Sequence, residues 1–181
     1  LTAWPAKRVE ACKPAMQYWL EQKGHAKLLI APHVEFLISA LTVTFNSADC
    51  AWMLAPRESC QTELSITSTN EFNAAKEQRL DITFIDPDEI TREPIRWIVD
   101  YKLTFFDEVK ELAIKELVLE ELALKKIALK ELTINDFEWL AEQHRPQLSR
   151  YAALFNNEGF RIKTAVFFIA HGKLVTLKSK A

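Results

Sequence analysis

The chain has 181 residues, of which only 3 are glycine, and it carries a formal net charge of −2. Because Gly24, Gly159 and Gly172 are so widely separated, neither the P-loop nor the Rossmann glycine pattern can be written, which excludes a free-standing nucleotide-binding module of either kind. The near-neutral charge argues against a protein whose whole surface attracts polyanions, and the 49% of hydrophobic residues excludes disorder for the bulk of the chain.

The cysteines and the apolar segments predict a cytoplasmic protein with no membrane partner. Cys12, Cys50 and Cys60 form no C-x-x-C pair and follow no signal peptide, so we expect them to be reduced and structural. The longest apolar runs are shorter than the roughly 20 residues that a membrane span needs. Because the chain begins at Leu1 without an initiator methionine, we expect it to be a fragment of a longer protein.

Residues 1–58 are predicted to form a helical lead-in. The first helix is indicated by apolar residues that recur at helical spacing before Gly24: Val9, Cys12, Met16, Trp19 and Leu20. A second helix is expected from about Pro32, with an apolar stripe made of Val34, Leu37, Ile38, Leu41 and Phe45. The polar run at 46–49 is expected to end it.

Residues 59–106 and 135–178 are predicted to form an α/β core. Five β-rich runs are expected to be strands: 63–67, 80–85, 95–103, 161–170 and 174–177. The turn-forming residues 86–88 favour an antiparallel meander for the first three, and His171-Gly172 forms a turn between the last two. The order of elements predicts one α/β domain, 1–181, with a mixed sheet of about five strands flanked by helices.

Residues 110–134 contain five pentads, KELAI, KELVL, EELAL, KKIAL and KELTI. Five residues advance a helix by about 500°, so the apolar pairs do not stay on one face, and an odd period also fails the alternation of a strand. The composition favours a helix, so residues 107–134 are interpreted as a helical insertion, with a β-solenoid of pentapeptide turns as the alternative. The next helix is expected to begin near Asn135 as its N-cap.

The strand-like runs 95–103 and 80–85 carry the charged residues of the candidate site. Asp100 and Lys102 are two positions apart on one strand, so they are expected to project from the same face of the sheet. An antiparallel neighbour would bring Asp81 alongside Asp100, with Glu63 as a possible third acid. Two carboxylates suit a hard cation such as Mg²⁺ or Mn²⁺. Lys102 could then orient or deprotonate water, or offset charge on phosphorus, which is the equipment for metal-assisted phosphodiester hydrolysis.

A solvated ion pair at a strand end is the competing interpretation of the Asp100 and Lys102 pair. The nuclease interpretation is favoured by the whole set of residues in chain order. That set includes Gln147 and Tyr151, which are at i and i+4 on one face of a later helix.

The other reactive residues are expected to be structural. None of the four histidines has the spacing of a metal-ligand pair, and surface or capping roles are expected for them: His25, His33, His144 and His171. Ser59 and Cys60 lack the surroundings of a nucleophile. Trp52, Trp97 and Trp139 are expected in the core rather than as platforms for bases.

Three strings of the sequence resemble a known family: RLDITFID at 79–86, RWIVDYK at 96–102 and RPQLSRYAAL at 145–154. They are similar to the C-terminal nuclease domain of RecB/AddA-type helicase-nucleases, which belong to the PD-(D/E)XK superfamily and include UvrD-like helicases of the exodeoxyribonuclease V beta-subunit type. WMLAP at 52–56, followed by ELSIT at 63–67, matches the segment before the first core strand of these proteins.

The resemblance covers residues 34–106 and 136–170, and it implies a restriction-endonuclease-like core that cleaves DNA with Mg²⁺ or Mn²⁺. By position it implies Asp81, Asp100 and the carbonyl of Tyr101 as metal ligands. Lys102 would be the catalytic lysine, with Asp81 and Asp100 as the catalytic acids.

The same resemblance implies supporting residues and partners. Glu63 matches an acid at the edge of the site, and Gln147 and Tyr151 match a Q-x-x-x-Y motif that contacts DNA or supports the lysine. The implied partners are DNA, the helicase motor domains of the parent chain and other subunits of a DNA repair or recombination complex.

The sequence also departs from the family. Family members carry a metal-binding histidine upstream of the first core strand, whereas neither His25 nor His33 has a matching context. Leu103 and Ile82 replace the usual polar and basic neighbours of the motifs, and the pentad repeat is foreign to the pattern. These departures motivate a second hypothesis, an inactive domain of the same fold that binds DNA or partner subunits.

Overall fold

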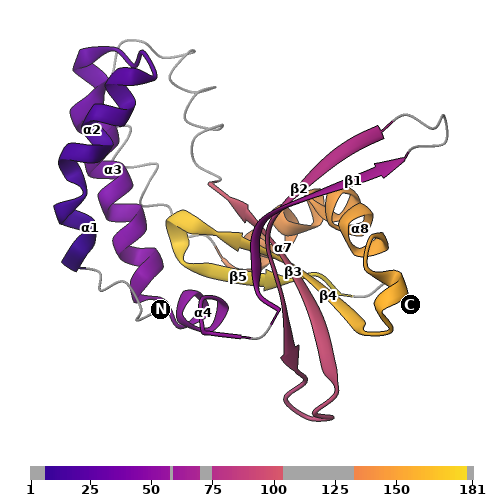
Figure 1. Ribbon diagram of the computed structural model, residues 1–181. Helices are drawn as coiled ribbons and strands as arrows, with labels where there is room; N and C mark the ends of the chain where they lie inside the picture. The colour runs from indigo at the N-terminus through magenta and orange to yellow at the C-terminus, as the bar shows by residue number, and fades with distance from the viewer. Residues whose placement is uncertain (1–6, 58, 70–74, 104–132, 179–181) are drawn as a thin grey trace. The chain divides into compact units, whose positions relative to one another are not determined.

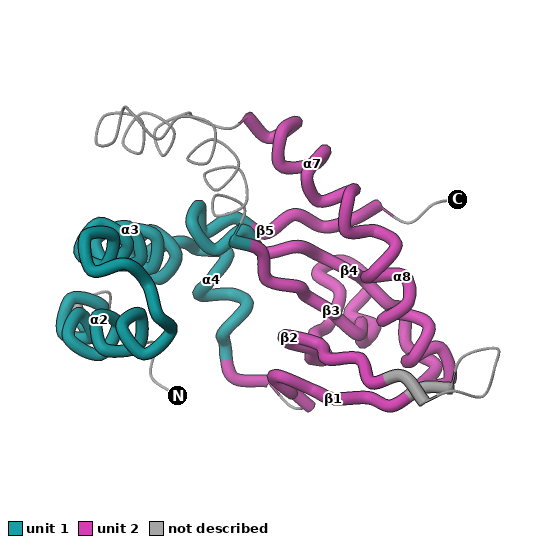
Figure 2. Tube along the Cα trace, turned by 90° about the horizontal axis from the view of Figure 1, so that it is seen from above, with its two compact units in different colours: residues 1–55, 103–115, 168–173 teal, residues 56–102, 116–167, 174–181 magenta. Residues whose placement is uncertain are grey.

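The computed structural model describes residues 7–57, 59–69, 75–103 and 133–178 (Figure 1). Within them the chain divides into two compact units (Figure 2). The first contains the residues up to 55 together with 103 and 168–173, and the second contains the remainder. Most of the expected insertion at 107–134 lies outside the described residues.

The first unit is helical, as the sequence predicts. Its helices are α1 (Lys7–Ala11), α2 (Lys13–Gln22), α3 (Lys27–Asn46) and α4 (Ala48–Met53), and it also contains the short turn η2 (Ile169–His171). The predicted apolar stripes form its core, in which Val9, Leu20 and Val34 are buried. Ser47 ends α3 and caps α4 by accepting a hydrogen bond from the N–H of Cys50 at 3.0 Å, so the predicted break is confirmed.

The start of α3 differs from the prediction. The helix begins at Lys27, so that Pro32 lies inside it and not at its first turn. A proline there lacks one helical hydrogen bond. The residues before it are good helix formers, and Ile30 among them is buried at 6% exposure, so packing offsets the missing bond.

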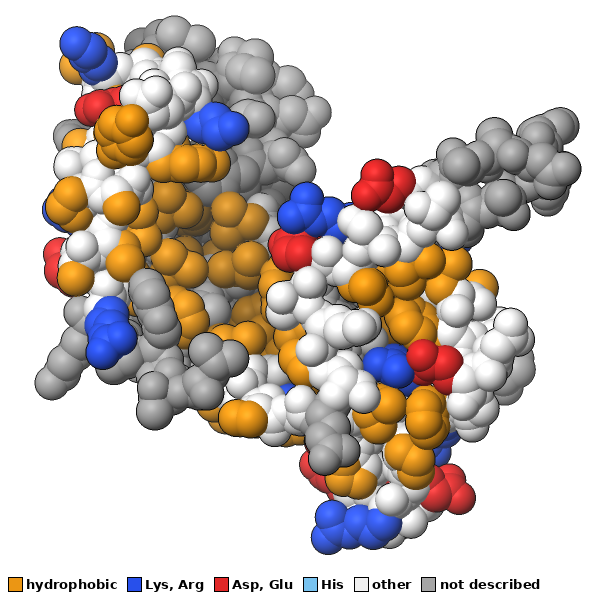
Figure 3. All heavy atoms as spheres, in the orientation of Figure 1, with side chains coloured by type: hydrophobic (Ala, Val, Ile, Leu, Met, Phe, Trp, Pro, Cys, Tyr) orange, Lys and Arg blue, Asp and Glu red, His pale blue; other side chains and the backbone are white. Residues whose placement is uncertain are grey.

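The surface of α2 and α3 is unusually apolar for exposed helices (Figure 3). Trp19, Leu28 and Val43 are among the exposed large side chains. By length and composition alone α3 could cross a membrane, with a mean hydropathy of 1.7, although core helices of water-soluble proteins share this property. The absence of a membrane partner therefore stays a prediction.

Gly172 is held in a position that only glycine fits. Its φ is +57°, and an added Cβ would lie 2.7 Å from Cβ of Ser47. We expect Gly172→Ala to lower the free energy of unfolding by about 2–5 kcal/mol, because the left-handed backbone and the overlap both cost energy. Gly24→Ala is the matched control, since Gly24 has φ +76° and nothing within 4 Å of such a Cβ. Urea denaturation should show that Gly24→Ala loses only about 1 kcal/mol of unfolding free energy. Equal losses in the two variants would contradict the expected overlap at Gly172.

The second unit contains most of the sheet. The strands are β1 (Gln61–Thr69), β2 (Ala75–Pro87), β3 (Pro94–Lys102), β4 (Arg161–Phe168) and β5 (Lys173–Thr176). They lie in the order β1-β2-β3-β4-β5, and β2 is antiparallel to both β1 and β3. The predicted meander and the later strand pair are confirmed, as is the α/β architecture with a five-stranded mixed sheet flanked by helices.

In the described residues between β3 and β4, three helical segments are present: α7 (Ile134–Gln143), α8 (Arg145–Ala153) and the short η1 (Asn156–Glu158). The predicted N-cap at Asn135 is wrong by two residues. Thr133 caps α7 by accepting from the N–H of Asp136 at 3.3 Å, while the carboxylate of Asp136 accepts from the N–H of Thr133 at 2.9 Å. This reciprocal box satisfies two helix-terminal donors, which Asn135 alone could not do.

Candidate functional site

Asp100 and Lys102 leave β3 on the same face, as the alternation of a strand requires. Asp100 is buried at 4% exposure. Nζ of Lys102 lies 2.6 Å from Oδ2 of Asp100, and the lysine side chain is 26% exposed. The pair is therefore not a solvated surface pair, because its anion is removed from water.

Asp81 lies beside this pair on the neighbouring strand. Ile82 of β2 pairs with Val99 of β3, so the antiparallel register places Asp81 opposite Asp100. Oδ2 of Asp81 accepts a hydrogen bond from the backbone N–H of Tyr101 at 2.6 Å. The expected meeting of the two carboxylates is thus present, and the backbone of Tyr101 lies next to both.

Two residues of α8 fix Asp100 from the helix side. Nε2 of Gln147 donates to Oδ1 of Asp100 at 3.2 Å and to the hydroxyl of Tyr151 at 2.8 Å. Gln147 and Tyr151 share a face of α8, as their spacing predicts, and Tyr151 is buried at 8% exposure. One oxygen of Asp100 is therefore committed to α8.

Glu63 lies at the edge of this cluster. Its neighbours Thr62 and Leu64 pair with Ile82 and Leu80, so the register places Glu63 opposite Asp81. Glu63 has φ +53°, and its carboxylate forms an exposed ion pair with Arg79. To act as a third acid, Glu63 would have to leave that arginine.

Burial is the main cause of a raised pKa at Asp81, and the hydrogen bond from Tyr101 opposes it. The carboxylates of Asp100 and Glu63 add to the rise, whereas the ammonium of Lys102 lowers it. Asp100 raises this pKa more than Lys102 lowers it, so a cation bound beside Asp81 would favour its charged form.

Because the pKa of Asp81 is raised, we expect Asp81→Asn to gain stability relative to the native protein as pH rises, when no metal is bound. The folded state holds the proton of Asp81 more tightly than the unfolded chain, so the native protein loses this contribution as pH rises through that pKa. The asparagine variant loses nothing, and its stability relative to the native protein should rise over the same interval. Denaturation series with a chelator present measure it.

Asp88→Asn is the control of opposite sign. Hydrogen bonds from the N–H groups of Thr91 and Ile90 lower the pKa of Asp88 to about 2, so the native carboxylate adds stability above its ordinary pKa, and this is lost as pH falls toward 2. Its asparagine variant should therefore lose relative stability as pH rises from 2. The same trend in both variants would contradict the electrostatic description of Asp81.

His144 belongs to the surroundings of this site, which the sequence interpretation missed. It links α7 to α8 and makes no side-chain cap bond, contrary to a capping role. Burial lowers its pKa most, nearby Lys102 lowers it further and Asp100 raises it. A signal was present in the sequence, because His144, Gln147 and Tyr151 follow the i, i+3, i+7 spacing of one helix face.

The residues fit a hexacoordinate hard cation better than a zinc ion. Within the described part of the chain, no three His, Cys, Asp or Glu side chains are grouped closely enough to hold a metal. Mg²⁺ commonly uses one or two carboxylates and keeps several waters. Oδ2 of Asp100 is buried and receives no hydrogen bond of ordinary geometry, although the Lys102 ammonium lies beside it. The carboxylates of Asp81 and Asp100 could therefore hold such a cation, and the carbonyl of Tyr101 stays a predicted ligand.

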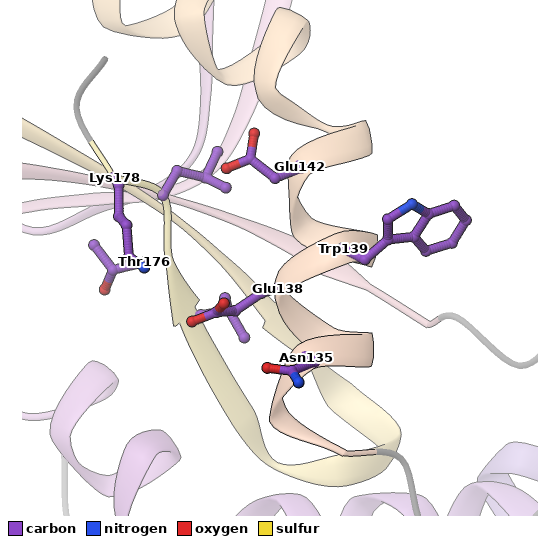
Figure 4. Close-up of a pocket in the computed structure, with 8 residues that line it drawn as sticks. Asn135, Glu138, Trp139, Glu142, Thr176 and Lys178 are labelled. Atoms are coloured by element: carbon purple, nitrogen blue, oxygen red, sulfur yellow. The ribbon is translucent and has the colours of Figure 1, made fainter. Parts of the chain in front are cut away.

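An open groove of about 330 Å³ lies elsewhere, between α7 and the segment around β5 (Figure 4). It is lined by Asn135, Glu138, Trp139, Glu142, Val175, Thr176, Leu177 and Lys178, none of which was expected in the site. The ring of Trp139 points away from the strand and is 64% exposed, so its expected core position is wrong. Phe137 and Ala141 are the buried residues of α7, whereas Trp97 is buried in the sheet as expected.

No family model matches the sequence, and no curated protein matches it significantly. The assignment of a function therefore depends on the residues of the site and on the resemblance of their motifs.

Proposed function

We propose that the chain is a Mg²⁺- or Mn²⁺-dependent nuclease domain that hydrolyses DNA phosphodiester bonds, of the RecB/AddA type within the PD-(D/E)XK superfamily. The observation that carries the proposal is the cluster of two strand-borne carboxylates and a lysine. Asp81 and Asp100 lie opposite each other, and Lys102 lies 2.6 Å from Asp100. This combination is suited to bringing a cation, a phosphate and a water molecule to one place.

The residues of the cluster divide into three roles in this proposal. Asp81, Asp100 and the carbonyl of Tyr101 would hold the metal, which would supply Lewis-acid chemistry when bound. The Lys102 ammonium orients the attacking water or offsets charge on the phosphate. Gln147 and Tyr151 hold Asp100 in place through the hydrogen bonds to its Oδ1 and to each other.

The parent protein is proposed to be a cytoplasmic helicase-nuclease of DNA repair or recombination. A tethered motor domain would supply most of the affinity for DNA through its high effective concentration, which is compatible with the formal net charge of −2. Other subunits of the complex are the further expected partners.

An inactive domain that binds DNA or partner subunits is the second candidate. It is favoured by the ion pair of Glu63 with Arg79. It is also favoured because, among the residues that the structure describes, no three metal-ligating side chains are grouped at the facing acids Asp81 and Asp100. These two acids alone would then serve as a polar element of the fold.

Degradation of linear DNA by the 181-residue chain separates the two candidates. Nuclease function predicts degradation that requires Mg²⁺ or Mn²⁺, stops with a chelator and falls by a hundredfold or more, on the order expected for a lost catalytic group, in Lys102→Ala. Lys163→Ala is the matched control, because Lys163 lies near Asp88 and over the ring of Trp97 instead. Equal activity in the native chain and Lys102→Ala, or no activity with either metal, would overturn the nuclease proposal.

A further inference from the structure

The position of Lys102 affects how a metal can bind at this site, and the inference below rests on the metal site of the proposed function. Each carboxylate at the site has one oxygen already engaged. Gln147 donates to Oδ1 of Asp100, and Tyr101 donates to Oδ2 of Asp81. The Asp100 oxygen left for a cation is Oδ2, and the Lys102 ammonium lies 2.6 Å from it.

A divalent cation and an ammonium cannot occupy the same side of one carboxylate oxygen. Both need direct contact with it, and two cations that close repel each other strongly in a partly buried site. The side chain of Asp100 is 5% exposed and is held by α8, whereas that of Lys102 is 26% exposed. The lysine is therefore the partner that moves.

We propose that Lys102 acts as an internal counter-ion that competes with the divalent metal for Oδ2 of Asp100. Without metal, the ammonium neutralises the buried carboxylate. Metal binding displaces the ammonium, which becomes available to the water or the phosphate beside the metal. The catalytic lysine is thus released by the same event that completes the site, and the metal-free protein keeps it engaged.

The first test measures the affinity of the full chain for Mn²⁺ and for Mg²⁺ by calorimetry without DNA. A competitor that occupies its site more than about 90% of the time weakens apparent affinity tenfold or more. Lys102→Met should therefore bind either metal at least about tenfold more tightly than the native chain. Lys163→Met removes the same charge beside Asp88 and Trp97 and should bind as the native chain does. Unchanged affinity in Lys102→Met would overturn the competition.

The second test uses the native chain and does not depend on a variant that folds. Lysines are acetylated briefly with acetic anhydride, with and without Mg²⁺, and modification is quantified peptide by peptide. Displacement predicts that Mg²⁺ raises the labelling of Lys102 several-fold while that of Lys163 stays constant. If Lys102→Met binds metal more tightly but Mg²⁺ leaves the labelling of native Lys102 unchanged, simple charge repulsion explains the affinity and the proposal is overturned.

The two proposals fail in different ways. Metal-dependent DNA cleavage with no change in Lys102 labelling leaves the nuclease function standing and removes the competition. Displacement of Lys102 by metal with no DNA cleavage removes the nuclease function and leaves the competition standing.

Discussion

Asp100→Asn is expected to reduce metal-dependent DNA cleavage by about a thousandfold or more, the scale at which residues that act as a catalytic unit fail. Asparagine offers one neutral oxygen where the native residue offers two charged ones. Gln147 already donates to Oδ1 of Asp100, so the neutral amide leaves the cation without its anionic ligand. Cleavage of linear DNA under single-turnover conditions measures the loss, and calorimetry with Mn²⁺ reports the lost ligand independently.

The stability of Asp100→Asn should change by no more than about 1 kcal/mol. The amide oxygen can still accept from Gln147, and Lys102 can turn to solvent because it is 26% exposed. Asp49→Asn is the matched control, since Asp49 also pairs with a lysine, at 3.8 Å from Nζ of Lys173. Full cleavage by Asp100→Asn, or an equal loss in Asp49→Asn, would contradict the assignment.

The sequence predicts the meander well because both of its signals are local. Alternation specifies β2, whose buried apolar residues Leu80, Ile82 and Phe84 lie on even positions, whereas β3 is a continuous β-rich run that is buried over most of its length. Turn chemistry is local too, since the side chain of Asp88 accepts from the N–H of Ile90 at 3.0 Å. Elements defined by packing, such as the start of α3 before Pro32, are less predictable, because tertiary burial decides them.

The site is predictable in part for the same reason. The common face of Asp100 and Lys102 follows from strand geometry, and their approach to Asp81 follows from an antiparallel register. The spacing of His144, Gln147 and Tyr151 groups them on one helix face, but the packing of α8 decides that this face meets Asp100. The ion pair of Glu63 with Arg79 depends on side-chain directions, which no short-range pattern encodes.

The sizes of the two energies involved argue against interpreting Lys102 and Asp100 as a surface ion pair. Exposed pairs contribute about 0.2–1 kcal/mol, whereas a buried carboxylate costs several kcal/mol in desolvation. Asp100 is 4% exposed, so stability alone gives little reason to place it there beside Asp81. A buried acid that faces a second, partly buried one is easier to explain as a cation site than as a structural feature.

A large effect on stability is also expected at another buried charge of β3. Both Nε and a terminal nitrogen of Arg96 contact Oε2 of Glu158, at 2.8 and 2.7 Å, and the side chain of Arg96 is 7% exposed. Glu158→Ala would leave the buried guanidinium of Arg96 over the ring of Phe155 without its anionic partner. We expect Glu158→Ala to lower the stability of β3 by about 2–4 kcal/mol. This is somewhat less than for breaking a fully buried pair, because the side chain of Glu158 is 35% exposed. Hydrogen exchange of the β3 amides reports this locally.

Glu142→Ala is the control for that prediction, because Glu142 pairs with Arg145 on the surface of the helices and its side chain is 46% exposed. Its loss should cost no more than about 0.5 kcal/mol. The double variant Arg96→Met with Glu158→Ala removes both charges and should recover most of the stability, since the cost of Glu158→Ala comes from the uncompensated Arg96. If the double variant is as unstable as Glu158→Ala, the loss arises from the packing of Glu158 and not from the buried charge.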